Sequence, residues 1–139
     1  MLIGEIRDDL KRAKEGLEFA ERNLQAGDFF TAANRIFVAC ENAVYVLLKS
    51  KFGSSTISRL RIITQLNEID KKAKKVYDES YDMRVQADYG RASRIIPLTK
   101  ENVERVLNEV KQVLRRAEEV VNKGDEMDVT GTGGVNGKN

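Results

Sequence analysis

The residues best suited to chemistry lie between positions 81 and 91, where the sequence reads Tyr-Asp-Met-Arg-Val-Gln-Ala-Asp-Tyr-Gly-Arg. Helical spacing predicts that Arg84, Asp88 and Arg91 share one face of a helix. An arginine offers a planar, permanently charged fork that matches the geometry of phosphate oxygens. Tyr89 adds an aromatic ring and a hydroxyl group. These residue types indicate a site for a phosphate-containing ligand.

The same spacing also has a simpler explanation, in which Arg84 and Asp88 form an ordinary ion pair along the helix surface. Taken alone, the spacing favours this ion pair, because exposed pairs of this kind are frequent and contribute little to stability. The residues alone therefore leave both interpretations open.

Several other kinds of site are excluded by composition. The chain has no histidine, which excludes catalytic triads, imidazole general bases and histidine-ligated zinc. Its one cysteine, Cys40, excludes an internal disulfide and fits a small buried hydrophobic residue. No glycine-rich phosphate loop follows a predicted strand, and we expect neither a metal nor a cofactor.

The candidate residues must be positioned by a central helix between Gly27 and Gly53, a stretch with no internal glycine or proline. Most of its circumference is apolar or small, so several other helices must cover it. Val38 and Tyr45 interrupt its polar side, which predicts contact with a second subunit there. The polar residues on this narrow arc are Thr31, Asn34, Arg35, Glu41, Asn42 and Lys49.

Apolar residues at steps of three and four predict further helices on either side of the central one. Gly90–Leu98 reads as a loop closed by Pro97, and we favour two helices over one bent helix before it. The first helix is expected over Glu5–Gln25. The third is expected from Ile57 to Asp70, after a cap in Ser54-Ser55-Thr56, and the fourth ends at Gly90. The last helix runs from its cap Thr99 to Gly124.

Together these segments predict an all-α protein, an up-and-down bundle of four to five helices over residues 1–124. A disordered glycine-rich tail is expected over residues 125–139. The 139 residues suffice for one domain with a real core. No apolar run approaches membrane-spanning length and the amino terminus lacks a signal-peptide layout, so we expect a cytoplasmic protein.

Charge is distributed unevenly along the chain. Residues 1–48 hold 6 basic and 8 acidic side chains, whereas residues 49–94 hold 11 basic and 6 acidic ones. The middle third is therefore able to present a basic surface to nucleic acid. Solvated lysines on a helix would give the same count, so this alternative stays open.

Three motifs in this order resemble the HEPN domains of prokaryotes, especially their small single-domain branch. They are the turn at 24–29 (Leu-Gln-Ala-Gly-Asp-Phe), the central-helix segment at 32–37 (Ala-Ala-Asn-Arg-Ile-Phe), and residues 84–90, which fit Arg-x-x-Ala-Asp-Tyr-Gly. Each motif alone is weak, but the ordered set is moderately specific.

The resemblance implies a helical bundle that is commonly a dimer and is related to RNA. Many HEPN domains are toxins or RNA-cleaving effectors, and genes for small ones often lie beside a minimal nucleotidyltransferase that acts as antitoxin. The ribonucleases use an arginine followed four to six residues later by a histidine, with both subunits contributing at the dimer interface. Arg84 fits the arginine. Tyr89 takes the place of the histidine, and Arg91 takes that of a tyrosine that partner enzymes modify with a nucleotide.

Three hypotheses follow. The first is a homodimer that binds RNA or a nucleotide without hydrolysis of its own, with a minimal nucleotidyltransferase as candidate partner in a toxin–antitoxin arrangement. Its cleft would be lined by Arg84, Asp88, Tyr89, Arg91, Asn34 and Arg35.

The second hypothesis is an atypical ribonuclease in which Arg84 stabilises charge on phosphate and Tyr89 or Asp88 handles the proton. Tyrosine titrates near pH ~10 and is a poor general base at neutral pH, so we lean against catalysis. The third is a helical interaction module in which the Arg84–Asp88 pair is purely structural.

Overall fold

The computed structural model describes residues 2–133, with side chains described over residues 3–124. Within these residues the chain forms five helices and no strand, which confirms the predicted all-α fold. None of these helices is long and apolar enough to cross a membrane. They are α1 (Leu2–Gln25), α2 (Phe29–Phe52), α3 (Arg59–Ile69), α4 (Lys71–Tyr89) and α5 (Lys100–Gly133).

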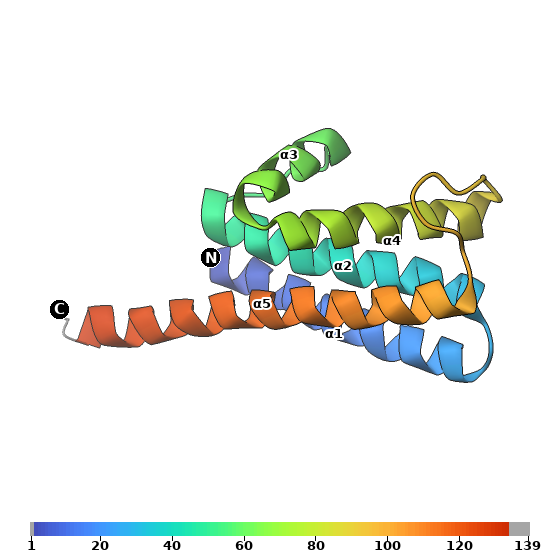
Figure 1. The fold of residues 1–139 in the computed structure, drawn as a ribbon. Coiled ribbons are helices and arrows are strands. Elements are labelled where there is room, and N and C mark those ends of the chain that lie inside the picture. The colour runs from blue at the N-terminus through green and yellow to red at the C-terminus, as the bar shows by residue number, and fades with distance from the viewer. Residues whose placement is uncertain (1, 134–139) are drawn as a thin grey trace.

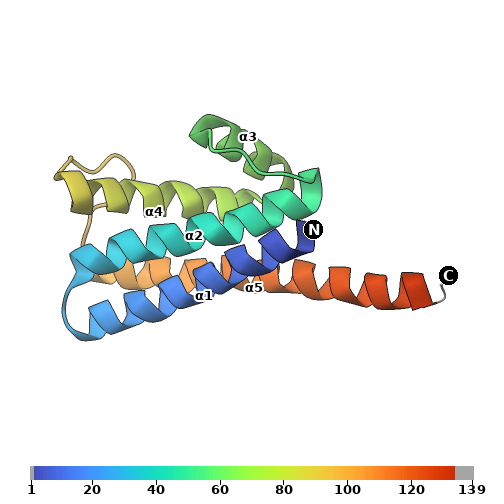
Figure 2. The same cartoon turned by 180° about the vertical axis from the view of Figure 1, so that it is seen from behind.

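Four long helices run side by side in alternating directions, and the short α3 crosses one end of the bundle (Figure 1). The view from behind shows α1 and α2 in front of α5 (Figure 2). The central helix α2 contacts all four other helices. This arrangement explains its composition, because a helix surrounded by neighbours must be apolar over most of its circumference.

Local signals in the sequence define both ends of α2. Asp28 caps it: its carboxylate accepts hydrogen bonds from the Thr31 backbone N–H at 3.1 Å and from the Thr31 hydroxyl at 2.6 Å. These bonds hold the pKa of Asp28 below its usual value. At the other end, Gly53 donates its N–H to the Lys49 carbonyl. The predicted boundaries of the central helix are therefore confirmed.

The approach of α1 to α2 depends on two small residues. A Cβ atom at Gly16 would lie 3.1 Å from the Cβ atom of Ala39, closer than such atoms normally come. Gly16 costs helix propensity, about 1 kcal/mol relative to alanine. Its position against α2 gives that cost a structural reason, since the two backbones approach closely only where side chains are small.

The region between α2 and α4 differs in detail from the prediction. Two helices form, as favoured, because Asp70 both ends α3 and caps α4 by accepting the Ala73 N–H. The cap of α3 is Ser58, not the earlier Ser54-Ser55-Thr56. We expected apolar residues at steps of three from Ile57 onward to face the core, but the first two, Ile57 and Leu60, are 97% and 75% exposed. The residues of α3 that enter the core are Ile62 and Leu66.

Three further boundaries or placements need correction. The first helix begins at Leu2 rather than Glu5. Asn42, expected on the polar arc of α2, is buried and donates its side-chain N–H to the Val38 carbonyl. The last helix does not stop at Gly124 but continues to Gly133, since a glycine weakens a helix without ending it unless it adopts a left-handed conformation. The rest of the predicted tail, 134–139, lies outside the described residues.

Candidate functional site

Asp88 joins the central helix to the end of α4. Its Oδ2 atom accepts a hydrogen bond from Arg84 Nε at 3.1 Å and another from Asn34 Nδ2 at 2.9 Å. The ion pair expected along α4 is present, and a partner from α2 extends it. Both bonds end on the same oxygen, and Oδ1 accepts no hydrogen bond within residues 3–124, so it is able to accept one from a hydroxyl or amino group of a ligand.

We call Arg84, Asp88, Asn34 and Arg35 the Asp88 cluster, and a shallow pocket of about 230 Å³ opens beside it. Arg35 lines it, with its guanidinium carbon 5.6 Å from the ring centroid of Phe19 on α1. Arg84 lies next to the pocket through its bond to Asp88. The lining residues are Phe30, Thr31, Asn34, Arg35, Ala87 and Asp88. The structure thus brings together four of the residues expected at one site, from two helices.

The Arg84 side chain is held in place without using all of its donors. Its guanidinium carbon lies 5.5 Å from the centroid of the buried Phe37 ring, and it gives Asp88 only its Nε–H. The terminal guanidinium nitrogens of Arg84 make no hydrogen bond within the described part of the chain. They are available for a bidentate contact with a phosphate group.

On α2, the carboxyl group of Glu41 lies in the electrostatic field of Arg84, and Tyr45 interacts with Glu41. Burial raises the pKa of Glu41, while a hydrogen bond from Tyr45 and the positive charge of Arg84 oppose the rise. Burial and then the charge of Glu41 raise the pKa of Tyr45 to about 12. Glu41 is therefore a half-buried carboxyl group beside the arginine, and Tyr45 remains a neutral hydroxyl donor at physiological pH.

The expectation that Arg91 shares a helix face with Arg84 and Asp88 is wrong. Helix α4 ends at Tyr89, and Gly90 takes a left-handed conformation with φ of 65°, which turns the chain away from the helical path. Arg91 lies in the following loop and is exposed. Tyr89 is 71% exposed. Neither residue makes a hydrogen bond or ion pair with Arg84, Asp88 or Asn34 within residues 3–124, and neither lines the pocket beside them.

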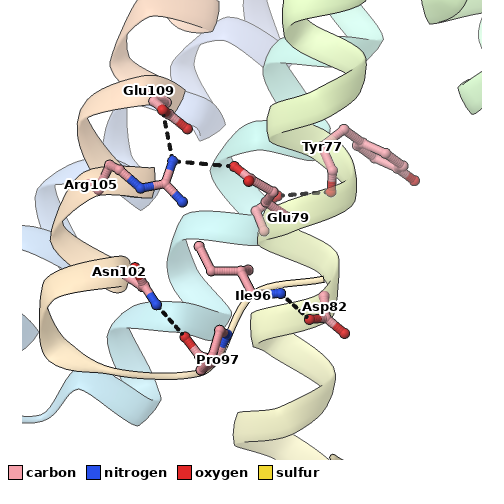
Figure 3. A network of polar contacts seen from close by, with 9 residues as sticks. Tyr77, Glu79, Asp82, Ile96, Pro97, Asn102, Arg105 and Glu109 are labelled. Atoms are coloured by element: carbon pink, nitrogen blue, oxygen red, sulfur yellow. Dashed lines mark hydrogen bonds and ion pairs between the residues drawn. The ribbon is translucent and has the colours of Figure 1, made fainter. Parts of the chain in front are cut away.

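The loop after Gly90 is held by a buried carboxylate, Asp82. This side chain is only 4% exposed and accepts the backbone N–H groups of Arg94, Ile95 and Ile96 at 3.0–3.3 Å. Figure 3 shows Asp82 of α4 reaching the loop at Ile96. Successive N–H groups that converge on one carboxylate form an anion-binding concavity, here filled by the protein itself.

Gln86, one turn further along α4, completes this anchor. Its amide nitrogen donates to the Ile96 carbonyl at 2.7 Å, and its amide oxygen accepts the Leu98 N–H at 3.0 Å. The same nitrogen also donates to Asp82 at 3.1 Å. The end of the loop therefore behaves as an extension of α4.

Helix α5 is tied to the loop and to α4 by further polar contacts. Thr99 caps α5, as predicted, by accepting the Asn102 N–H. The Asn102 side chain donates to the Pro97 carbonyl, and Arg105 lies between the buried Glu79 of α4 and Glu109 of α5 (Figure 3). These contacts join α4, which carries Arg84 and Asp88, to the loop and to α5.

Groups able to hold a metal ion or act as a nucleophile are scarce. No cluster of three or more cysteine, aspartate or glutamate side chains suited to a metal occurs among the described residues. Cys40 is fully buried, and burial raises the pKa of its thiol to about 12. A thiol that stays protonated is a poor nucleophile, so Cys40 serves packing.

Comparison with known protein families shows to which family the chain belongs. The sequence model of the HEPN domain matches residues 6–120, which include every residue of the Asp88 cluster. The chain belongs to the HEPN domain family. No curated protein sequence matches it. Membership supports a role of the general HEPN type, related to RNA binding or RNA cleavage.

Within this HEPN domain, the residues expected at a dimer interface differ in accessibility. Val38 is exposed on α2, whereas Tyr45 is partly buried and packs against the core of its own chain. Sequence reasoning placed Glu41 on the polar arc but assigned it no function, and it did not single out Phe37 or Asp82. Only the spacing of Phe37 and Glu41, four residues apart on the central helix, signalled that they share a face.

Proposed function

We propose that this HEPN protein binds RNA or a nucleotide through Arg84, Asn34 and Arg35, and does not hydrolyse it. The observation that carries the proposal is the shared acceptor at Asp88. It holds an arginine from α4 and an amide from α2 beside a pocket that Asn34 and Arg35 line, while the terminal nitrogens of Arg84 make no hydrogen bond among the described residues. A guanidinium group beside a carboxylate suits a phosphate linked to a ribose. The guanidinium would bind the phosphate oxygens, and the carboxylate would accept a hydrogen bond from a ribose hydroxyl.

The lack of a suitable base supports binding over catalysis. The chain has no histidine. Tyr89, which stands in the histidine position of the family motif, is exposed and makes no hydrogen bond with Arg84 within the described residues. The Asp88 carboxylate is ion-paired with Arg84 and also hydrogen-bonded to Asn34, and both contacts make it a weaker base even though its Oδ1 is open. A general base must reach the proton it removes and be free to accept it.

RNA cleavage without histidine remains a second candidate, on the strength of Glu41. Its carboxyl group has a raised pKa and lies in the field of Arg84. A carboxyl group of raised pKa next to an arginine is one arrangement used in acid–base catalysis.

We also propose that the protein works as a homodimer through the α2 face that carries Val38, and that a minimal nucleotidyltransferase is its partner. The exposure of Val38 supports the first part. Replacement of the exposed Val38 by glutamate, Val38→Glu, is expected to yield monomers in size-exclusion chromatography with light scattering. An unchanged dimer would refute this interface.

The deciding experiment compares wild-type protein, Arg84→Ala and a matched control, Arg115→Ala. Arg115 is an exposed arginine on α5 that bonds Gln112. Binding of labelled single-stranded RNA and of nucleotides is measured by fluorescence anisotropy, and RNA cleavage is assayed with free metal chelated. Removal of a charge-assisted hydrogen bond is expected to weaken binding about 10- to 100-fold in Arg84→Ala only, with no cleavage by any protein.

Two outcomes would contradict the proposal. Cleavage that disappears in Arg84→Ala would make the protein a ribonuclease, and Glu41→Gln would then identify the proton carrier. Equal binding by wild-type protein and Arg84→Ala, with a lower melting temperature for the variant, would favour a structural ion pair.

A further inference from the structure

A second charged surface lies between α4 and α5, away from the Asp88 cluster. Two adjoining pockets of about 360 Å³ and 260 Å³ share Arg116 as a common wall. The first is closed by the end of α2 and the junction of α3 with α4, and the second by the first turns of α4. The charged lining residues are Lys51, Asp70, Arg116, Glu119 and Lys123 in the first pocket, and Lys72, Lys75, Glu109 and Arg116 in the second.

The two pockets together form a groove, and four of its lysines have no ion-pair partner among the described residues. Lys51, Lys72, Lys75 and Lys123 form no ion pair or hydrogen bond within residues 3–124. By contrast, Lys74, in the same run of sequence, pairs with Asp78 at 3.2 Å. Two of the three carboxylates in the groove are already neutralised.

These two carboxylates are held by arginines. Asp70 receives Arg116 Nε at 2.6 Å and a second bond from the same guanidinium at 3.3 Å, and Glu109 receives Arg105 at 2.8 Å. Only Glu119 opposes the four lysines. The groove therefore carries a net positive charge.

The backbone fixes where this charge lies. Asp70 caps α4 and binds Arg116 with the same carboxylate, so the start of α4 is tied to α5. Lys72 and Lys75 are one helical turn apart and face the same pocket. The wall of the groove is rigid, while the lysine side chains are exposed and mobile enough to follow a ligand.

We propose that this groove is a second contact surface for the phosphate backbone of RNA. Positive charge along a groove, without aromatic side chains or a deep pocket, suits a repeating chain of phosphates better than a single small ligand. Lys72 lies about 18 Å from Arg84 along the axis of α4, at 1.5 Å per residue. An RNA strand is long enough to contact both surfaces.

The inference rests on the proposed binding of RNA, but it concerns different residues, so the two are separable. The test variant is Lys72→Gln combined with Lys75→Gln. The matched control is Lys11→Gln combined with Lys100→Gln, two exposed lysines elsewhere that also lack an ion pair in the described part of the chain. Both variants remove the same charge, and glutamine keeps the helix propensity of lysine.

Binding of a single-stranded RNA is measured by fluorescence anisotropy over a range of salt concentrations, beside Arg84→Ala. The groove variant is expected to bind about tenfold more weakly. The slope of log K against log salt should fall by about 1.4, or 0.7 for each phosphate that the variant no longer neutralises, while the control keeps the wild-type slope.

Each other outcome is decisive. A groove variant with wild-type affinity and slope overturns the groove, and a loss confined to Arg84→Ala then leaves the first site standing. A loss confined to the groove variant supports the groove and overturns the Arg84 site. If the groove variant keeps RNA binding but loses binding of poly-glutamate, the surface recognises an acidic protein and the RNA proposal is wrong.

Discussion

Two carboxylates on α4, Asp82 and Asp88, do opposite things although they lie close together in the sequence. Asp82 is buried and accepts backbone N–H groups from a neighbouring loop. Asp88 is near the surface and accepts side-chain donors from Arg84 and Asn34. Backbone N–H donors are fixed by the path of the chain, whereas side-chain donors are able to change rotamer and bind a ligand instead.

Asp82 therefore has a structural role and Asp88 a role in the proposed binding site, although the two residues lie within two turns of one helix. A buried acceptor that is lost strands the donors around it, at about 1–3 kcal/mol for each unsatisfied group. An exposed ion pair contributes between zero and about 1 kcal/mol, and water replaces it easily. Asp82 should therefore be essential to the fold, and Asp88 should be exchangeable when a ligand arrives.

The strongest test of the comparison is Asp82→Ala. Three loop N–H groups would lose their acceptor and Gln86 would lose one of its acceptors, so we expect the free energy of unfolding to fall by about 2–4 kcal/mol. Chemical denaturation followed by circular dichroism measures it. Asp82→Asn keeps the size and one acceptor oxygen and should be intermediate. A decrease below about 0.5 kcal/mol for Asp82→Ala would show that the loop does not depend on this carboxylate.

Gln86→Ala tests the other half of the loop anchor. The bonds to Ile96 and Leu98 would be absent, but Asp82 would still hold three N–H groups. A destabilisation of about 1–2 kcal/mol is expected. Faster hydrogen exchange at Leu98, with unchanged exchange at Ile96, would show that each side chain holds its own part of the loop. Equal acceleration at both amides would mean that they act as one unit.

Asp88→Ala should affect stability much less, by under about 1 kcal/mol, because its partners are partly exposed. Its effect on RNA binding should be smaller than that of Arg84→Ala. Loss of orientation of Arg84 and Asn34 weakens binding, while removal of a negative charge near phosphate opposes that loss. Anisotropy measurements on both variants compare the two effects. A stability loss as large as that of Asp82→Ala would remove the distinction between the carboxylates.

The smallest expected effect concerns Glu41. Its pKa is raised in the folded state, chiefly by burial, so its contribution to stability is fully present below its unfolded pKa of about 4.5 and is lost as pH rises through the folded value. Glu41→Gln should therefore stabilise the protein at pH 7, by less than about 1 kcal/mol, and give no gain at pH 3. Thermal melts at both pH values measure this. A gain independent of pH would exclude ionisation as its cause.

Much of the fold was predictable because its signals are local. The apolar circumference of α2, the cap at Asp28 and the cap at Thr99 follow from short stretches of sequence. Spacing also predicted the Arg84–Asp88 pair. The face assigned to Arg91 failed because Gly90 ends the helix before it.

The long-range contacts were not predictable in the same way. Nothing in the sequence near Asn34 shows that it meets Asp88, and the loop that Asp82 binds has no pattern that names its acceptor. The start of α3 was misplaced because Ser54, Ser55, Thr56 and Ser58 are all suitable caps. Only the packing of Ile62 and Leu66 against the bundle selects Ser58.

The contact of Gly16 with Ala39 restricts how this protein can evolve. A side chain larger than hydrogen at position 16 collides with Ala39, and a side chain larger than methyl at position 39 needs the space that Gly16 leaves. We therefore expect a substitution at one of the two positions to require a compensating substitution at the other. In a set of homologues, the side-chain volumes at positions 16 and 39 are expected to vary inversely. The distance between α1 and α2 is thus set by the combined size of two residues, and selection acts on that combined size.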